Sequence, residues 1–321
     1  MNYRNEFRVE PGRRVRLEDF DPSYTEKHER KQSAHRKIKK LQQRMDELQF
    51  QLYAEQKRSL LICLQALDAG GKDGVVRHVI GPMNPQGCRV VGFKQPSAEE
   101  LAHDFLWRIE HQTPRRGEVV IFNRSHYEDV LVVRVHELVP QEVWSERYEI
   151  INDFERGLVA NGTHILKFFL HISKEEQLER FKDRLDDPER HWKISEADYS
   201  ERERWARYEE AYEDALTKCS TDDAPWFVIP SDHKWFRNLA ISQIIVETME
   251  KLGIQLPEPT VDIADIRRKY HEAVGRAKTK KAGGGRGMNE STGEGIHPDG
   301  QWRFAEHQAR AVRGREDTLW R

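Results

Sequence analysis

The sequence predicts an α/β fold in which a parallel sheet of about five strands lies between two layers of helices. Three observations lead to this prediction. Short apolar runs alternate with longer segments of helical periodicity, which is the pattern of βαβ units in a three-layer domain. The first run, residues 59–67, is almost continuously apolar, as expected of a strand covered on both faces. A glycine-rich turn follows this run directly and leads into a helix.

The first half of the chain begins with a charged, irregular arm, residues 1–30, that we expect to lie over the domain. An amphipathic helix over 31–55 follows, because its apolar side chains fall three and four positions apart. These side chains are Ile38, Leu41, Met45, Leu48 and Leu52. The next expected elements are a strand (59–67), a helix ending at Gly81 and Pro82, a strand (89–93), a helix (97–110) and a strand (118–122). The helix from Ser97 begins with a capping box, since Glu100 lies three residues later.

The second half continues the alternation of helices and strands. We expect, in chain order, helices at 128–135 and 145–161, a strand at 164–172, a helix from Ser173 to 187, a long helix from Ser195 to about 216, a strand at 226–229 and a helix at 238–252. From about residue 257 the chain is basic and rich in glycine, which predicts a weakly structured tail. The expected organisation is an arm (1–30), one α/β domain (31–256) with a lid at about 180–198, and the tail (257–321).

Composition excludes several classes of protein. Lys plus Arg number 53 against 55 for Asp plus Glu, so the net charge is -2 and no protein-wide basic field marks a nucleic-acid coat. Any binding of phosphate must therefore be local. No apolar run approaches the roughly 20 residues that cross a bilayer. Three scattered cysteines form no disulfide framework, and the charged start of the chain has no secretory pattern, so we expect a cytoplasmic protein without membrane contact.

The strongest local signal is the segment LDAGGKDG, residues 67–74, between the first strand and its helix. Backbone N–H groups of such a glycine-rich turn can surround phosphate oxygens, and Lys72 adds a cation. The segment departs from the P-loop pattern G-x-x-x-x-G-K-[ST] at two positions. Ala66 stands at the first glycine, and Asp73 stands where a Ser or Thr would hold Mg²⁺. The alternative is a tight turn with an exposed lysine.

A second motif, NRSHYED at residues 123–129, follows the strand at 118–122. Open α/β sheets place their ligand sites at the carboxyl ends of their strands. P-loop enzymes carry an acidic residue for magnesium near this point, but this chain has Asn123. Asp68 is therefore the better candidate for a metal ligand, with Asp73 as the second choice.

A third segment is rich in arginine and lysine, with Arg180, Lys182 and Arg184 followed by Arg190 and Lys193. Phosphoryl transfer needs positive charge around the transferred group and no protein nucleophile, so arginines on a lid would serve it. Interleaved acidic residues leave open the alternative of a solvated helix face with ion pairs.

Together these three segments closely resemble the polyphosphate kinase 2 family, and the form NRSHYED is similar to its class III branch. The resemblance covers about residues 5–255. It implies a thymidylate-kinase-like P-loop kinase fold with a helical lid. It also implies Mg²⁺-dependent transfer, with Mn²⁺ as a possible substitute, of the terminal phosphate of inorganic polyphosphate to AMP and ADP. Members of the family often assemble as dimers or tetramers, so a homo-oligomer is expected.

Carried over by position, the resemblance assigns the catalytic roles and the metal ligands. The catalytic set is Asp68, Lys72, Arg124, Arg134 and Arg184. Asp68 and Asp73 are the candidates for metal ligands. The resemblance links Glu128 to the acceptance of AMP as well as ADP. The remaining candidates for phosphate or nucleotide contacts are Gly70, Gly71, Asp73, Gly74, Arg77, Lys94, Asn123, Tyr127, Glu128 and Arg180. Within this set Arg77 and Lys94, with Arg115 and Arg116, are looser candidates for a basic groove.

Two alternatives remain at this point. An ATP-dependent nucleoside monophosphate kinase would share the fold, the phosphate loop and the arginine lid, and would differ in its donor. A non-catalytic module that binds polyphosphate or RNA would use the basic groove together with the arginine-rich tail. The second alternative is disfavoured, because the net charge is slightly negative and no pattern of stacking aromatic residues accompanies the basic ones.

Overall fold

The computed structural model describes residues 2–27 and 29–283. Its contacts divide the chain into a unit from Met1 to Glu258 and a second unit from Pro259 onward. The first unit contains the predicted α/β fold. In the second unit the structure describes one helix, α12 (Ile263–Gly283). This helix lies within the segment that we expected to be weakly structured, and residues 284–321 of that segment lie outside the described part.

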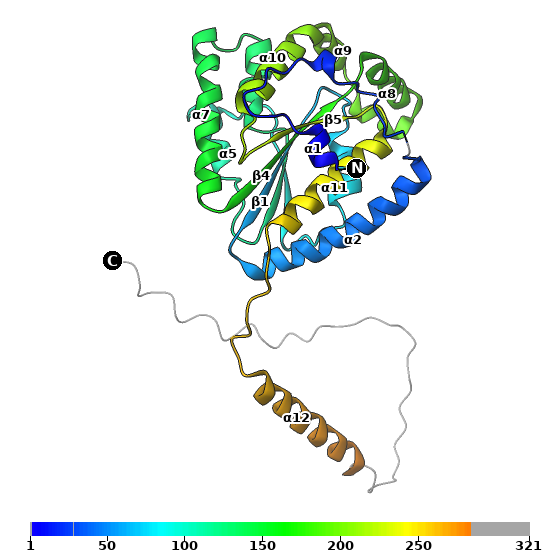
Figure 1. Cartoon of the computed structure of the whole chain (residues 1–321), viewed down its shortest axis with the longest axis vertical. Coiled ribbons are helices and arrows are strands. Elements are labelled where there is room, and N and C mark those ends of the chain that lie inside the picture. Colours follow the sequence, from blue (N-terminus) through cyan, green and yellow to red (C-terminus); the bar gives the residue numbers. More distant parts are fainter. Residues whose placement is uncertain (1, 28, 284–321) are drawn as a thin grey trace, which may run out of the picture. The chain divides into compact units, whose positions relative to one another are not determined.

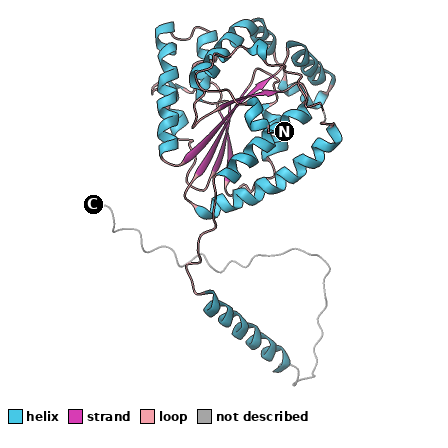
Figure 2. Ribbon diagram, in the orientation of Figure 1, coloured by secondary structure: helices cyan, strands magenta, loops and turns pink. Residues whose placement is uncertain are grey.

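A five-stranded parallel sheet forms the centre of the first unit, as predicted (Figure 2). Its strands are β1 (Ser59–Gln65), β2 (Cys88–Gly92), β3 (Val119–Asn123), β4 (Thr163–His171) and β5 (Trp226–Pro230), in the order β2-β3-β1-β4-β5. Every residue of β1 and β5 is buried. The central position of β1, with β3 on one side and β4 on the other, explains its uninterrupted apolar sequence.

Helices cover both faces of the sheet (Figure 1). On one face, α2 (Lys31–Glu55) and α11 (Lys234–Lys251) pack against Leu60, Ile62 and Leu64. The opposite face is covered by α7 (Gln141–Ala160) and α10 (Trp205–Cys219), which belong to two further apolar clusters that include Leu61 and Phe169. Alternate residues of one strand therefore enter different cores, which is the arrangement of a three-layer domain.

The N-terminal arm is anchored on the sheet edge. Its short helix α1 (Tyr3–Phe7) buries both terminal aromatic residues in the core on the α2 and α11 side. Val9 N–H then donates a hydrogen bond to the Trp226 carbonyl at 2.9 Å. The arm thus adds backbone contact to β5, and a 3₁₀ turn at Leu17–Asp19 follows.

Several predicted helices are interrupted in the structure. The helix expected at 97–110 is two short helices, α4 (Ala98–Leu101) and α5 (Trp107–Glu110). Between them the Asp104 side chain accepts from Leu106 N–H at 2.9 Å, a local turn that competes with a continuous helix. The helix expected at 128–135 is a 3₁₀ turn (His126–Asp129) followed by α6 (Val132–Val135). The long helix from Ser195 is divided at Arg204 into α9 (Glu196–Glu203) and α10.

The remaining helices frame the lid and the phosphate loop. Helix α3 (Lys72–Val75) continues as a π-helical turn (Val76–Ile80) after the loop. Helix α8 (Lys174–Asp186) is followed by a 3₁₀ turn, Pro188–Lys193, as the Asp-Pro sequence predicts. No helix in the described ranges has both the length and the apolar character needed to span a bilayer.

A buried ionic network lies beneath the segment 123–129. Lys167 on β4 donates to Glu155 of α7, to the Tyr127 hydroxyl at 2.9 Å and to the Cys219 carbonyl at 2.6 Å. Glu155 also accepts from Tyr127 at 3.0 Å and contacts His126 Nε2 at the same distance. Burial lowers the pKa of His126, so the imidazole is neutral near pH 7. The network ties the segment that follows β3 to two other elements.

Removing one member of this network should destabilise the domain strongly. Lys167→Met leaves the Glu155 carboxylate buried without its cation, which is expected to lower the free energy of unfolding by about 3–5 kcal/mol. The double variant Glu155→Gln, Lys167→Met removes both charges and should recover most of this loss. Urea unfolding measures both values. Equal stability of Lys167→Met and the wild type would contradict the interpretation.

Candidate active site

The segment LDAGGKDG, residues 67–74, is the phosphate loop. It follows the carboxyl end of β1 and includes the start of α3. Two residues in it have left-handed backbone conformations, Ala69 (φ 59°) and Gly71 (φ 103°), and the second is the N-cap of α3. A side chain at Gly70 would stand 2.5 Å from the Ala66 Cβ, so the turn also needs glycine there. Lys72 Nζ donates to the Ala66 carbonyl at 2.8 Å. The lysine is therefore held over the loop at the edge of the sheet.

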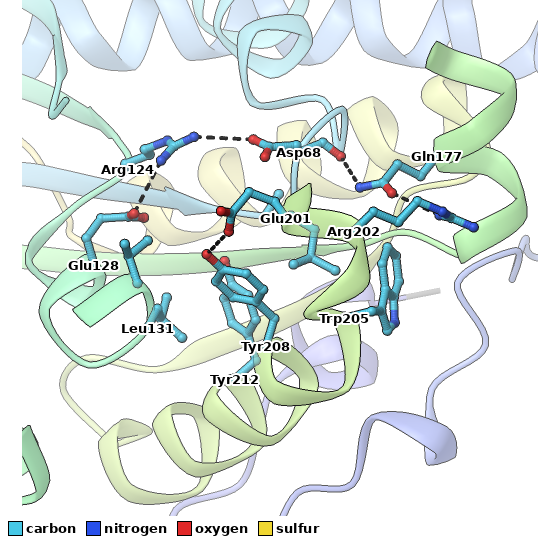
Figure 3. Close-up of a pocket in the computed structure, with 13 residues that line it drawn as sticks. Asp68, Arg124, Glu128, Leu131, Gln177, Glu201, Arg202, Trp205, Tyr208 and Tyr212 are labelled. Carbon is cyan, nitrogen blue, oxygen red and sulfur yellow. Dashed lines mark hydrogen bonds and ion pairs between the residues drawn. The ribbon is translucent and has the colours of Figure 1, made fainter. Parts of the chain in front are cut away.

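Arg124 comes directly after β3, the strand beside β1, and faces the phosphate loop. Its backbone is left-handed (φ 64°), which is unusual for a residue with a side chain. Its guanidinium lies between two carboxylates, at 3.3 Å from Asp68 and 3.4 Å from Glu128 (Figure 3). Glu128 in turn accepts from Gln65 Nε2 at 3.0 Å. These contacts hold the Arg124 guanidinium at the carboxyl edge of the sheet.

A cavity of about 1090 Å³ opens at this edge. Cationic side chains from four segments of the fold converge on it, including Lys72, Arg77, Lys94, Arg124 and Lys193. The predicted site residues that line it are Asp68, Gly70, Gly71, Lys72, Asp73, Gly74, Arg77, Lys94, Asn123, Arg124, Arg180 and Arg184. Such a concentration of positive charge suits a ligand with several phosphate groups.

Comparisons with known proteins identify the family of the chain. The model of the family described as "Polyphosphate kinase 2" matches residues 28–257. The chain belongs to the polyphosphate kinase 2 family. The AMP/ADP-polyphosphate phosphotransferase of Meiothermus ruber is 53% identical over 254 residues, which are 79% of this chain and 95% of that protein. The ADP-polyphosphate phosphotransferase of Rhodopseudomonas palustris is 46% identical over 267 residues, 79% of this chain and 92% of that protein.

A solved member of the polyphosphate kinase 2 family has the same fold. The crystal structure of polyphosphate kinase 2 from Arthrobacter aurescens TC1 superposes with a TM-score of 0.82 at 41% identity, over 85% of this chain and 97% of the other. The family and the fold that the sequence motifs indicated are thereby confirmed. The family match ends at residue 257, before α12.

Three predicted site residues, Arg134, Tyr127 and Glu128, do not line the main cavity. Arg134 on α6 donates to Asp214 at 2.6 Å and to the Tyr148 hydroxyl at 3.2 Å, and it lies 4.5 Å from the centre of the Trp144 ring. These contacts direct it into a separate hollow of about 810 Å³. Tyr127 is fully buried in the ionic network, so it has no surface for a nucleotide. Arg134 and Tyr127 therefore do not line the main cavity, and their contact with phosphate or nucleotide stays a prediction.

Glu128, the third of these residues, lines a small pocket of about 40 Å³ beneath Arg124 (Figure 3). Aromatic residues that the sequence analysis did not single out form its wall, among them Trp205, Tyr208 and Tyr212. Asp68, Arg124 and Tyr208 line both this pocket and the main cavity. Glu128 thus holds Arg124 in place by an ion pair. It does not line the main cavity itself, but its partner Arg124 does.

The far end of the segment expected to form the lid, residues 180–198, also contacts the phosphate loop. Lys193, at the end of the 3₁₀ turn, lies 3.5 Å from the Asp73 carboxylate, which also accepts from Asn123 Nδ2 at 3.0 Å. Arg184 donates to the Lys193 carbonyl at 2.8 Å and so stabilises this turn. Trp192 beside it is 78% exposed. The lid arginines are therefore partly occupied in holding the lid itself.

Two buried arginines lie behind the phosphate loop. Arg180 was a predicted site residue, and the structure shows it fastening the loop by donating to the Ala69 carbonyl at 2.8 Å and pairing with Glu176 at 2.8 Å. The sequence pattern gives no signal for Arg237, because it predicts a helix that begins at residue 238, whereas α11 begins at Lys234. It approaches Gly70, Gly71 and Gly74 from the interior.

The site carries more positive charge than its own carboxylates balance. Burial and the neighbouring Arg124 lower the pKa of Lys72 to about 8, although Asp68, Glu128 and Asp73 act in the opposite direction. Burial disfavours a charged Asp73, but hydrogen bonds from Asn123 and Lys193 lower its pKa overall. An anionic ligand in the cavity would relieve the repulsion between Lys72 and Arg124.

Proposed function

We propose that this chain transfers phosphoryl groups from inorganic polyphosphate to AMP and ADP. The observation that carries the proposal is the convergence of Lys72, Arg124 and the lid on one cavity at the carboxyl edge of the sheet. The names of the relatives from Meiothermus ruber and Rhodopseudomonas palustris support the donor and the acceptors. We assign the reaction to residues 31–256, with residues 180–198 as the lid.

The cavity provides for the chemistry in two ways. Phosphoryl transfer passes through a loose transition state whose negative charge spreads over the equatorial oxygens, so catalysis depends on positioning and on neutralising charge. The loop and Lys72 hold one phosphate group, and Arg124 faces the same point from β3. Arg77 and Lys94 extend the cationic lining, as needed for a long donor chain.

The carboxylates of the cavity fit a magnesium ion. Asp68 and Asp73 both line it, while the described residues contain no group of three or more His, Cys, Asp or Glu that could hold a metal by themselves. Mg²⁺ is commonly bound by one or two carboxylates together with water and substrate phosphates. We propose Asp68, with Asp73 as the alternative, as its protein ligand, and Mn²⁺ could take the same place. When bound, the ion neutralises charge on the phosphate groups.

A comparison of polyphosphate and ATP as phosphoryl donors distinguishes this function from that of a nucleoside monophosphate kinase. Purified protein with Mg²⁺ and AMP or ADP is incubated with long-chain polyphosphate in one reaction and with ATP in another. We expect ADP and ATP to form with polyphosphate, and we expect AMP phosphorylation with ATP to be much slower. Chromatography of the nucleotides measures the products. Efficient use of ATP without use of polyphosphate would overturn the proposal.

The two arginines of the segment 124–134 should differ in their effect on turnover. Arg124→Met removes a cation that faces the transferred phosphate and should lower kcat by roughly 10³-fold. Arg134→Met is the matched control, because its guanidinium is engaged by Asp214 and Tyr148 outside the cavity. It should leave kcat per folded molecule within about threefold and reduce stability instead. Similar losses of kcat in both variants would restore a catalytic role to Arg134.

Substitution of Glu128 should slow the phosphorylation of AMP more than that of ADP. Glu128→Asn removes one of the two carboxylates that hold Arg124, and AMP has fewer phosphate oxygens with which to fix a displaced arginine. We expect kcat/KM to fall further for AMP than for ADP, and Glu128→Gln should show the same preference. Steady-state kinetics with both acceptors measures the ratio. An equal loss on both would count against a role in acceptor choice.

Assembly and location remain predictions for this chain. The family resemblance predicts a dimer or tetramer, and the sequence predicts a cytoplasmic enzyme.

A further inference from the structure

Arg237 is a buried cation directly behind the phosphate loop. Its side chain lies on α11, in a residue that is 2% exposed. Its guanidinium donates to Asn238 Oδ1 at 3.1 Å from Nε and at 2.9 Å from Nη2, and Nη1 lies 3.5 Å from the Gly70 carbonyl. All of these acceptors are neutral. Among the residues that the structure describes, no carboxylate forms an ion pair with Arg237.

The glycines of the loop make this approach possible. A Cβ at Gly71 would stand 1.9 Å from Arg237 Nη1, and a Cβ at Gly74 would stand 2.9 Å from Nη2. The positive φ of Gly71 already favours glycine, but Gly74 has no such backbone requirement. Its lack of a side chain leaves room for the guanidinium. Gly71 and Gly74 therefore leave room for the Arg237 guanidinium on the interior side of the loop, and they line the cavity on its other side.

A charge in this position is unfavourable in the free protein. Burying an ion without a counter-ion costs free energy, and a second cation, Arg180, also lies against the loop, with Nη1 3.5 Å from the position of a Cβ at Gly71. Burial, followed by the repulsion from Arg180, lowers the pKa of Arg237 to about 9. Arg180 differs because it pairs with Glu176. The missing counter-ion of Arg237 would be an anion on the other side of the glycine loop.

We propose that Arg237 is a positioning residue that attracts the phosphate groups of the substrate through the glycine loop, with the bound polyanion as its counter-ion. The inference rests on the proposed function. The loop is thin at Gly71 and Gly74, and the interior side is dry, so the attraction is weakly screened. The buried charge of Arg237 destabilises the free protein, and the same charge stabilises the complex with phosphate.

The test uses the full chain and two substitutions of Arg237. Arg237→Met removes the charge and keeps an unbranched apolar stem, whereas Arg237→Lys keeps the charge. For Arg237→Met we expect an unchanged or higher melting temperature without ligand, a smaller rise in melting temperature with polyphosphate, and a KM for polyphosphate raised about tenfold. The change in kcat should be smaller than the change in KM. Arg237→Lys should restore KM to within about threefold of the wild type.

A second variant tests the same contact from the loop. Gly74→Ala places a methyl group 2.9 Å from Arg237 Nη2, closer than such contacts allow, and should displace the guanidinium, so KM for polyphosphate should rise in this variant too. Combining Gly74→Ala with Arg237→Met should raise KM little beyond the effect of Arg237→Met alone.

The opposite pattern would overturn the inference. A residue that only packs would, when replaced by methionine, lower the melting temperature or prevent folding while leaving KM unchanged in the molecules that fold. Failure of Arg237→Met to fold counts against the proposal for that reason. If polyphosphate does not raise the melting temperature of the wild type at all, the proposed function itself fails. If polyphosphate raises the melting temperature of the wild type and of Arg237→Met equally, and KM is unchanged, only the role of Arg237 fails.

Discussion

The structure depends on one electrostatic constraint, the gathering of positive charge at one edge of a sheet in a chain whose net charge is -2. Lys72 and Arg124 repel each other across the cavity, and Arg180 and Arg237 add two buried cations behind the loop. Asp68 and Glu128 hold Arg124, while Asp73 engages Lys193 of the lid. These contacts keep the cations in place but do not neutralise them all, so the site is prepared for an anion.

The fold produces this arrangement through strand order. Because β1 and β3 are neighbours in the sheet, the phosphate loop and Arg124 leave the same edge side by side, although they are far apart in sequence. The Glu155 and Lys167 network anchors the residues after Arg124 to α7 and β4. Helix α11 brings Arg237 against the loop from the other face. Each layer of the domain thus contributes a charge or a fixed contact to the site.

The sequence was sufficient for the sheet and for the two motifs at its edge, since continuous apolar strands and a glycine-rich turn are local signals. It is not sufficient where tertiary contacts decide where a side chain lies. The motif places Arg134 among the phosphate contacts, whereas Asp214, distant in sequence, and Trp144 hold its side chain outside the main cavity. Tyr127 lies in a charged motif yet is buried with Lys167. Arg237 gave no local signal, because only the folded loop shows what it approaches. The helices expected at 97–110 and from Ser195 are each divided in two, and the local sequence pattern gives no signal for either break.

We propose that polyphosphate and the acceptor nucleotide bind together in the cavity that Lys72 and Arg124 line. The most direct test is a crystal structure of the complex with Mn²⁺, a short polyphosphate and AMP, in which anomalous scattering locates the metal. The account predicts phosphate groups in contact with Lys72 Nζ and the Arg124 guanidinium, with the manganese peak at the Asp68 carboxylate or, as the alternative, at Asp73. Polyphosphate bound on another face, with the cavity between these residues filled only by solvent, would contradict it.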